Sequence, residues 1–359
     1  MPIPIKETLG MLSDNLELRA SVLPISRRRR SAWTRGLGIP HGGPTVLYTG
    51  QMYQIVPAIN AMTARLARME GSWMARYFGL ARRLNRWVNL AGMMARGDPT
   101  EVREATRALQ DIARLLQTAG VEFGSLGADD LYAGALAHDE GLDDVLVRHA
   151  ERVYAGLRSR GVKEVITVDP HTTYMLRSIY PRIVRSYDLK VRTYLEVLVE
   201  RSPRATADLD VDVTIHDSCL YARREGVAEQ PRELLRRGGV RIHEAELSGR
   251  ATQCCGGPIE MLFPARSNEI ARQRIEQLAK CSSQVVTLCP LCLANLRRAA
   301  PKDLAVTDVS SYLARAYGSR SVAAGGARLP RPEPSPTVRT PAAAERVPGH
   351  PAGSARSAP

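Results

Sequence analysis

The chain has 359 residues, 44% of them apolar and 24% charged, which is enough to build an ordinary globular core. It has no run of about 18 apolar residues and starts without the basic-then-apolar pattern of a secretory signal, so we expect a cytoplasmic protein. The net charge of +13 gathers at the ends, since residues 1–44 carry seven Lys/Arg against three Asp/Glu and residues 318–359 carry six against two.

The first 44 residues are predicted to form a basic N-terminal extension. Arg27 to Arg30 give it a cluster that could attract nucleic acid or an anionic membrane. No aromatic-rich or recognised nucleic-acid module accompanies the cluster, so we do not expect nucleic acid as a partner. We expect a solvated basic arm, available to a partner protein. His41-Gly42-Gly43-Pro44 is typical of a linker into the first core strand.

The body alternates short runs rich in β-branched residues with helical patterns. A helical insertion is expected at 60–115, where Asp98, Pro99 and Glu101 form a helix-start pattern. Trp73 and Trp87 lie in it, 14 residues apart on one helical face, and we expect them in the core or in a subunit contact. Strand–helix alternation predicts an α/β fold with mostly parallel sheets. The predicted strands are 45–49, 121–126, 164–168, 211–216, 240–244 and 284–288.

Residues 318–359 differ in composition from the body. They contain eight of the 23 prolines, together with many Ala, Gly and Ser residues. Such a segment cannot bury enough apolar surface to offset its loss of conformational entropy on ordering. We therefore predict a disordered C-terminal tail.

Five of the six cysteines fall into one ordered pattern. Between Cys219 and the pair Cys254-Cys255, which precedes Gly256, lie 34 residues, and between Cys255 and Cys289-Pro290-Leu291-Cys292 lie 33. Thiolates gathered from three segments favour a soft metal centre, iron–sulfur or zinc, over magnesium or calcium. Gly256 and Gly257 would let the backbone approach such a centre and offer amides to its sulfurs.

Other interpretations apply to single cysteines. Cys289 and Cys292 alone fit a thioredoxin-like dithiol, which would leave the remaining thiols of the pattern without a role. Cys281 lies outside the pattern, on a predicted helix, and we expect a packed core thiol there.

The two halves of the body form a weak repeat. Each half reads strand, helix, strand, helix, strand, and glycine and proline keep their places while the cysteines do not. We predict a first module at 45–205 and a second at 206–317. The positions of the second module's cysteines are matched in the first by other residues, namely Gln51, Tyr132, Ala133, Asp169 and Thr172.

Over about residues 45–300 the chain resembles the cysteine-rich "CCG" domain family of heterodisulfide reductases and related oxidation systems. The motifs that carry the resemblance are His216-Asp217-Ser218-Cys219, Cys254-Cys255-Gly256-Gly257 and Leu288-Cys289-Pro290-Leu291-Cys292. Family members usually carry two such modules in tandem. The resemblance implies a [4Fe-4S]-type, non-cubane cluster, with zinc as the alternative found in some members. The implied ligands are Cys219, Cys254, Cys255, Cys289 and Cys292.

The chain departs from the family pattern in three places. Ser218 replaces the usual proline, and Pro258-Ile259-Glu260 replaces a glycine-rich stretch after the paired cysteines. The first module lacks its cysteines altogether, so we do not expect a second cluster there.

Three polar residues are candidates for proton transfer. His216 and Asp217 precede Cys219 and could deliver protons to a leaving sulfur, since thiol formation consumes protons. Asp217 could equally cap the next helix, and His216 could be a hydrogen-bonded core residue. His171 could face the same interface, although its turn is also explained by Pro170.

The resemblance therefore predicts a heterodisulfide-reductase-like oxidoreductase subunit that passes electrons to or from a thiol or disulfide. The chain has no ferredoxin cysteine run, so electrons are expected from a ferredoxin-like, flavin or membrane cytochrome protein, which could hold the chain at a membrane. The alternative is a zinc-bearing structural or assembly subunit of a redox complex.

Overall fold

The structure is a computed structural model that describes residues 5–69, 77–94 and 96–318. By its contacts the chain divides into Met1–Gly326 and Ala327–Pro359, and all described residues belong to the first unit. The predicted disordered tail lies outside the described residues except for Gly318, and so does Trp73.

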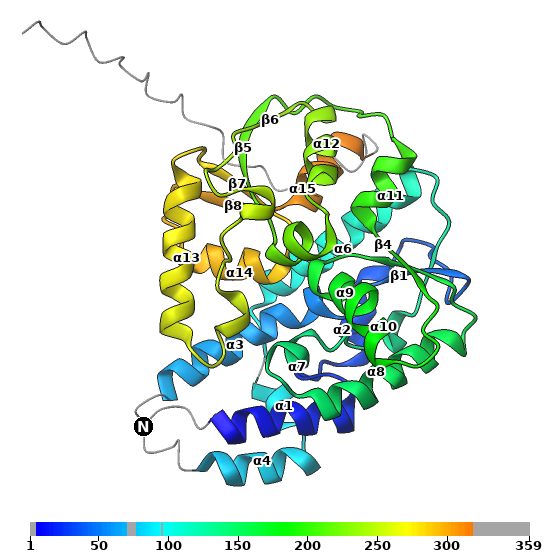
Figure 1. Ribbon diagram of the computed structural model, residues 1–359, viewed down its shortest axis with the longest axis vertical. Helices are drawn as coiled ribbons and strands as arrows, with labels where there is room; N and C mark the ends of the chain where they lie inside the picture. Colours follow the sequence, from blue (N-terminus) through cyan, green and yellow to red (C-terminus); the bar gives the residue numbers. More distant parts are fainter. Residues whose placement is uncertain (1–4, 70–76, 95, 319–359) are drawn as a thin grey trace, which may run out of the picture. The chain divides into compact units, whose positions relative to one another are not determined.

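The described strands form two four-stranded sheets in which every pairing is parallel (Figure 1). The first sheet has the order β2-β1-β3-β4 and the second the order β6-β5-β7-β8. The identical order confirms the prediction of two related α/β modules. The strands are β1 (Thr45–Tyr48), β2 (Gly124–Ser125), β3 (Glu164–Thr167), β4 (Lys190–Thr193), β5 (Val211–His216), β6 (Val240–Ile242), β7 (Gln284–Thr287) and β8 (Ala305–Asp308).

The sequence did not predict β4 or β8, which occupy the same edge position in the two sheets. Both strands have four residues and lack a continuous apolar run. Lys190 of β4 is exposed, and β8 alternates half-buried with buried residues. An edge strand is covered on fewer sides than a central one, so its sequence carries a weaker hydrophobic signal.

Helices cover the sheets and make up most of the described part of the predicted insertion. Asp98 accepts hydrogen bonds from the backbone of Thr100 and Glu101, as its sequence pattern predicted, and starts α6. The insertion contains α3 (Met52–Met69), α4 (Phe78–Trp87), α5 (Leu90–Met94) and α6 (Pro99–Thr118). The later helices are α7 (Ala135–Asp139), α8 (Asp143–Arg158), α9 (Pro170–Tyr174), α10 (Tyr180–Ile183), α11 (Tyr194–Arg201), α12 (Glu229–Arg237), α13 (Pro264–Ala279), α14 (Pro290–Ala299) and α15 (Val309–Tyr317).

Residues 5–44 pack onto this body, so they do not form the solvated arm that the sequence predicted. They include α1 (Ile5–Arg19), whose Leu12 and Leu16 are buried in the main hydrophobic core, and the short α2 (Arg27–Arg30). Arg27 pairs with Asp129 at 2.8 Å. The boundary of an extension at residue 44 stays a prediction, because α1 shares its core with the first module.

The two modules are joined by direct contacts. The Tyr53 hydroxyl on α3 donates to Asp308 Oδ2 at the end of β8, at 2.9 Å. Arg297 on α14 pairs with Glu104 on α6. None of the helices in the described ranges is both long and apolar enough to cross a bilayer.

Strand register positions the candidate site. His216, the last residue of β5, lies opposite Thr287, the last residue of β7. Because parallel strands end at the same edge of a sheet, the segments that follow them meet there. Cys219 and Cys289 lie in these two segments.

Candidate metal centre

The five patterned cysteines come together at the carboxyl edge of the second sheet. Cys219 precedes the helical turn Leu220–Glu225 after β5, and Cys289 is the residue before α14. The Sγ atoms of Cys219 and Cys254 are 4.0 Å apart, and those of Cys255 and Cys292 are 3.2 Å apart. Cys254 also contacts Cys255, and Cys289 contacts Cys292, so the five thiols form a continuous set.

This thiol set is made of free thiols, and three of them are buried. Cys255, Cys289 and Cys292 are buried, whereas Cys219 and Cys254 are partly exposed. Cys281 lies apart, half-buried, with its Sγ 3.6 Å from the Glu244 carbonyl oxygen.

Two glycines bring backbone amides to the sulfurs. The Gly256 N–H donates to Cys254 Sγ and the Gly257 N–H donates to Cys255 Sγ, both at 3.4 Å. Gly256 has φ +79°, and a Cβ there would lie 2.9 Å from the Ser267 carbonyl oxygen. A side chain at this position would therefore strain the turn and displace the amides.

The thiols lie so close together that their pKa values shift in different directions. Hydrogen bonds from Cys254 and Cys292 lower the pKa of Cys255 to about 6. Burial opposes ionisation of Cys289, but its interactions with Cys292 and His171 hold its pKa well below the usual range. The pKa of Cys292 is raised, because Cys255 and Cys289 are its neighbours. Several thiolates this close repel one another unless a cation lies among them.

His216 borders the buried part of the set. A ring nitrogen of His216, Cys255 Sγ and Cys292 Sγ all lie within 4.8 Å of one another. Its Nδ1 accepts from Arg274 Nε at 3.2 Å, so the neutral ring carries its proton on Nε2. Burial, and then the charge of Arg274, lower the pKa of His216 to about 3.

Asp217 is held by a buried ion pair. Its two carboxylate oxygens accept from Arg232 at 2.7 and 2.8 Å, and Oδ2 also accepts from the Gly249 N–H at 2.7 Å. The Asp217 carbonyl oxygen accepts from the Thr252 hydroxyl. These contacts fix the loop that leads to Cys254, and they do not cap a helix.

His171 reaches the set from the first module. It lies in α9, whose first backbone amides donate to the Asp169 carboxylate. The His171 Nδ1 atom is 3.6 Å from Cys289 Sγ. Burial lowers the pKa of His171, but the Cys289 thiolate and two nearby carboxylates outweigh it and raise the pKa to about 10.

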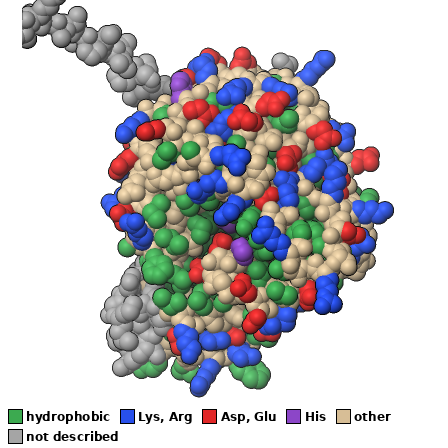
Figure 2. Space-filling view, viewed as in Figure 1, with side chains coloured by type: hydrophobic (Ala, Val, Ile, Leu, Met, Phe, Trp, Pro, Cys, Tyr) green, Lys and Arg blue, Asp and Glu red, His purple; other side chains and the backbone are tan. Residues whose placement is uncertain are grey.

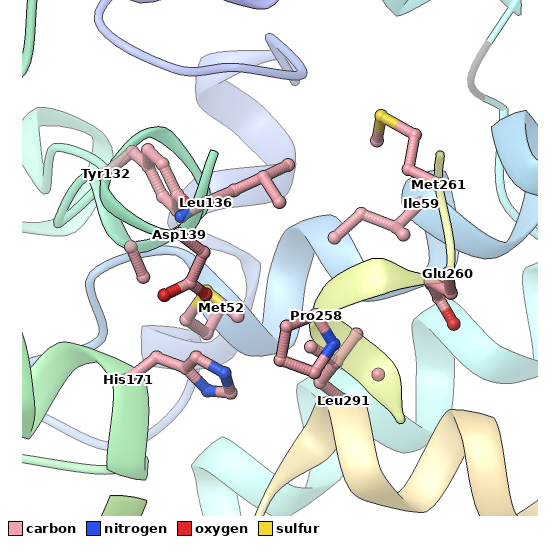
Figure 3. A pocket seen from close by; sticks show the side chains of 12 residues that line it. Met52, Ile59, Tyr132, Leu136, Asp139, His171, Pro258, Glu260, Met261 and Leu291 are labelled. Atoms are coloured by element: carbon pink, nitrogen blue, oxygen red, sulfur yellow. The ribbon is translucent and has the colours of Figure 1, made fainter. Parts of the chain in front are cut away.

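A narrow pocket lies beside His171, between the first module and the loop after Gly257 (Figure 3). Its free volume of about 20 Å³ is close to what one water molecule needs. Figure 3 shows His171 and Asp139 on one side, facing Pro258 and Leu291. Figure 2 shows hydrophobic side chains gathered around a hollow on this face. The remaining lining residues include Met52, Ile59, Tyr132, Leu136, Glu260 and Met261.

In the first module, the residues that stand at the cysteine positions make hydrogen bonds within the protein. The Gln51 amide donates to the Asp130 carbonyl oxygen, and the Thr172 hydroxyl donates to that of Thr49. The Tyr180 hydroxyl donates to the carbonyl oxygen of Ala133. All six cysteines of the chain lie after residue 218, so the first module offers no thiols for a second cluster.

Sequence reasoning missed the side chains that support the site. Arg232, Arg274 and Asn295 lie on helices α12, α13 and α14, where Asn295 donates to the Cys255 carbonyl oxygen. Arginine is common on exposed helix faces, so nothing in the sequence distinguished the two buried ones. Whether an arginine is buried depends on how its helix packs against the residue that accepts its hydrogen bonds, and the sequence alone does not give that packing.

Comparisons with known proteins match this region. The model of the cysteine-rich domain family, CCG, matches residues 213–297. "EtfAB:quinone oxidoreductase" of Syntrophomonas wolfei is 30% identical over 204 residues, covering 53% of this chain and 28% of that protein. "Probable iron-sulfur-binding oxidoreductase FadF" of Bacillus subtilis is 30% identical over 208 residues, covering 56% and 29%.

A third relative is one of the subunits of the dihydromethanophenazine:CoB--CoM heterodisulfide reductase of Methanosarcina acetivorans. It is 26% identical over 221 residues, covering 57% of this chain and 54% of that protein. The chain thus spans between about a quarter and about half of the length of these curated relatives. Residues 213–297 therefore belong to the CCG cysteine-rich domain family, and the relatives of the chain are iron–sulfur oxidoreductases and heterodisulfide reductase subunits.

Proposed function

We propose that the protein is an electron-transfer subunit of a heterodisulfide-reductase-like complex. In this proposal Cys219, Cys254, Cys255, Cys289 and Cys292 hold one [4Fe-4S]-type cluster. The observation that carries the proposal is the gathering of five thiols at one sheet edge, with two backbone amides donating to them.

The donor set fits an iron–sulfur cluster. Thiolate is the ligand that such clusters require, and a conventional [4Fe-4S] cluster uses four of them. A fifth thiolate leaves one free for an additional or bridging bond. Hydrogen bonds from Gly256 and Gly257 to sulfur would tune the reduction potential. A bound cluster would supply one-electron steps to a two-electron disulfide reaction.

The surrounding side chains would orient a substrate sulfur and hold protons near it. His171 borders Cys289 and lines the pocket, and we propose that a thiol or disulfide approaches there after the pocket widens. His216 borders the set from the other side. Proton delivery by Asp217 stays a prediction that its contacts do not favour, because Arg232 and Gly249 occupy both oxygens.

The electrons must come from another protein under this proposal. The described residues gather a single thiol set, and the relatives extend well beyond the matched region. We propose a ferredoxin-like, flavin or membrane cytochrome protein as the partner.

Electron transfer is tested with chemical partners. The anaerobically purified protein is mixed with reduced methyl viologen and cystamine, and viologen oxidation is followed by absorbance. We expect oxidation that depends on cystamine and is lost in Cys289→Ser. Equal rates in wild type and variant would contradict a role for the thiol set.

One observation favours a second function. His216, Cys255 and Cys292 are residues of the kind that bind zinc, and His216 would ligate through Nε2, the ring nitrogen that Arg274 does not occupy, after Nε2 gives up its proton. The protein would then be a zinc-bearing structural subunit. Absorption in the visible range separates the two functions, because iron–sulfur protein is brown and zinc protein is colourless.

A further inference from the structure

The outer face of α4 exposes a row of apolar side chains. Leu80 is 64% exposed, Leu84 is 50% exposed and Trp87 is 89% exposed. These residues are spaced four and three apart, and an α-helix turns by roughly 100° per residue, so they lie on one face. We call these three residues the α4 stripe. Trp87 is therefore not a core residue, and its exposed ring is available for a contact outside the chain.

The opposite face of α4 is fastened to the protein. Arg82 Nε pairs with Asp14 Oδ2 at 2.8 Å, and the Asn85 amide donates to Asn15 Oδ1 at 2.8 Å. Arg19 donates to the Asn85 carbonyl oxygen. All three partners lie on α1, which packs between α4 and α8 (Figure 1). The helix cannot turn its stripe inward without breaking these buried and part-buried contacts.

The charge around the stripe is positive. Residues 77–93 contain three arginines and no aspartate or glutamate. Arg83 and Arg86 are exposed, and no carboxylate of the described residues pairs with either of them. Two of the three acids of α1 act on Arg82, since Asp14 pairs with it and Glu7 lies close enough to act on it through its charge, while Glu17 pairs with Arg148. Beyond the helix end, Met93 on α5 is also 56% exposed.

We propose that α4 is a membrane-contact helix that rests on an anionic lipid surface. A tryptophan and leucines on one helix face, bordered by arginines that no described carboxylate neutralises, are the chemistry of interfacial helices. Acyl chains accept the α4 stripe, and lipid phosphates accept Arg83 and Arg86. A protein partner fits less well, because three side chains on one helix offer far less than the area of a standard interface. This contact goes beyond electron transfer and would hold the protein at a membrane surface.

Vesicle binding tests the proposal with the full chain. Vesicles of phosphatidylcholine alone and with added phosphatidylglycerol are sedimented with the protein. We expect binding only to the anionic vesicles, weakened by salt. The double variant Arg83→Gln/Arg86→Gln should bind about 25-fold more weakly, since each arginine contributes roughly fivefold at such a surface. Leu80→Ser/Leu84→Ser should remove most binding. Leu247→Ser, an exposed site on the second module, is the matched control and should bind like wild type.

Fluorescence shows whether the stripe enters the lipid. The difference in emission between wild type and Trp87→Phe isolates Trp87 from the buried Trp33 and from Trp73. We expect this difference spectrum to shift to shorter wavelength with anionic vesicles. No binding, binding unchanged in both double variants, or binding without the shift would each overturn the proposal. So would concentration-dependent self-association that the α4 variants abolish, because the face would then be a contact between copies.

Discussion

Cys255 lies in the middle of the thiol set, in contact with Cys254 on one side and Cys292 on the other. It is buried, its pKa is lowered to about 6, and the Gly257 amide donates to it. These features favour the thiolate, which is the form that binds metal. Cys281 differs from Cys255, because it lies outside the thiol set, packs against the hydrophobic core and has its Sγ near the carbonyl oxygens of Glu244 and Gln277.

Replacement of Cys255 by Ala should abolish metal binding, since it removes the thiolate that links the two ends of the set. Cys281→Ala should keep wild-type metal content. Both variants are purified anaerobically and assayed for iron, sulfide and zinc. Wild-type metal in Cys255→Ala would exclude this residue as a ligand.

Arg232 supports the site through charge. Its replacement by Met would leave the buried Asp217 carboxylate without its cation and should destabilise the fold by roughly 3 to 5 kcal/mol. Arg241→Met breaks an exposed pair with Asp212 and should change stability little. Denaturant unfolding of both variants measures the difference. Similar midpoints for the two would show that the Asp217 pair does not stabilise the loop before Cys254.

At the scale of elements, the turn at Gly256 is the most demanding part of the site. Gly256 and Gly249 both have positive φ, at +79° and +55°. A Cβ at Gly256 meets the Ser267 carbonyl oxygen and Ile270, whereas a Cβ at Gly249 meets nothing within 4 Å. A side chain at Gly249 would therefore strain only the backbone, whereas one at Gly256 would strain the backbone and also clash with its neighbours.

The Gly256→Ala variant should lose its metal and also unfold more easily, because strain and contact add. Gly249→Ala should show only the strain, about 1 to 2 kcal/mol, and keep its metal. Metal content and thermal unfolding are compared for the two variants. Full metal content in Gly256→Ala would mean that the turn tolerates a side chain and that its amides are not needed.

Elements differed in how well the sequence predicted them. The central strands β1, β3, β5 and β7 carry near-continuous apolar or β-branched runs and were found close to their predicted ranges. The edge strands β4 and β8 lack such runs and were missed. The thiols could be grouped because cysteine is rare and its spacing is informative. Arg232 and Asn295 could not, because their roles depend on how α12 and α14 pack.

At the scale of the whole molecule, the two modules share core and contacts. Matching strand order supports our proposal of modules at 45–205 and 206–317, and exposed residues between α11 and β5 mark the junction. His171 crosses from the first module to Cys289 in the second. The first module therefore contributes a side chain to the surroundings of the thiol set, although it has no thiols of its own.

Buried titratable groups give the fold a dependence on pH. His149 on α8 is held neutral: burial lowers its pKa from 6.5 to about 4, although its Nε2 bonds to the Tyr132 carbonyl oxygen at 2.6 Å. Between these pH values the unfolded chain binds a proton that the folded chain does not. His149 therefore lowers the free energy of unfolding as pH falls from 6.5 to 4, by roughly 3 kcal/mol in all.

His149→Gln should flatten the loss of stability over this range, because glutamine does not titrate. Urea unfolding of wild type and variant at several pH values measures the two slopes, and only their difference is attributed to His149. Parallel slopes would show that His149 protonates equally in both states.

The central claim is that five thiols at the edge of the second sheet hold an iron–sulfur cluster. The measurement that tests it most directly is the iron, sulfide and zinc content per chain after strictly anaerobic purification. We expect about four iron with matching sulfide. About one zinc without iron would contradict the claim and make the protein a zinc-bearing structural subunit.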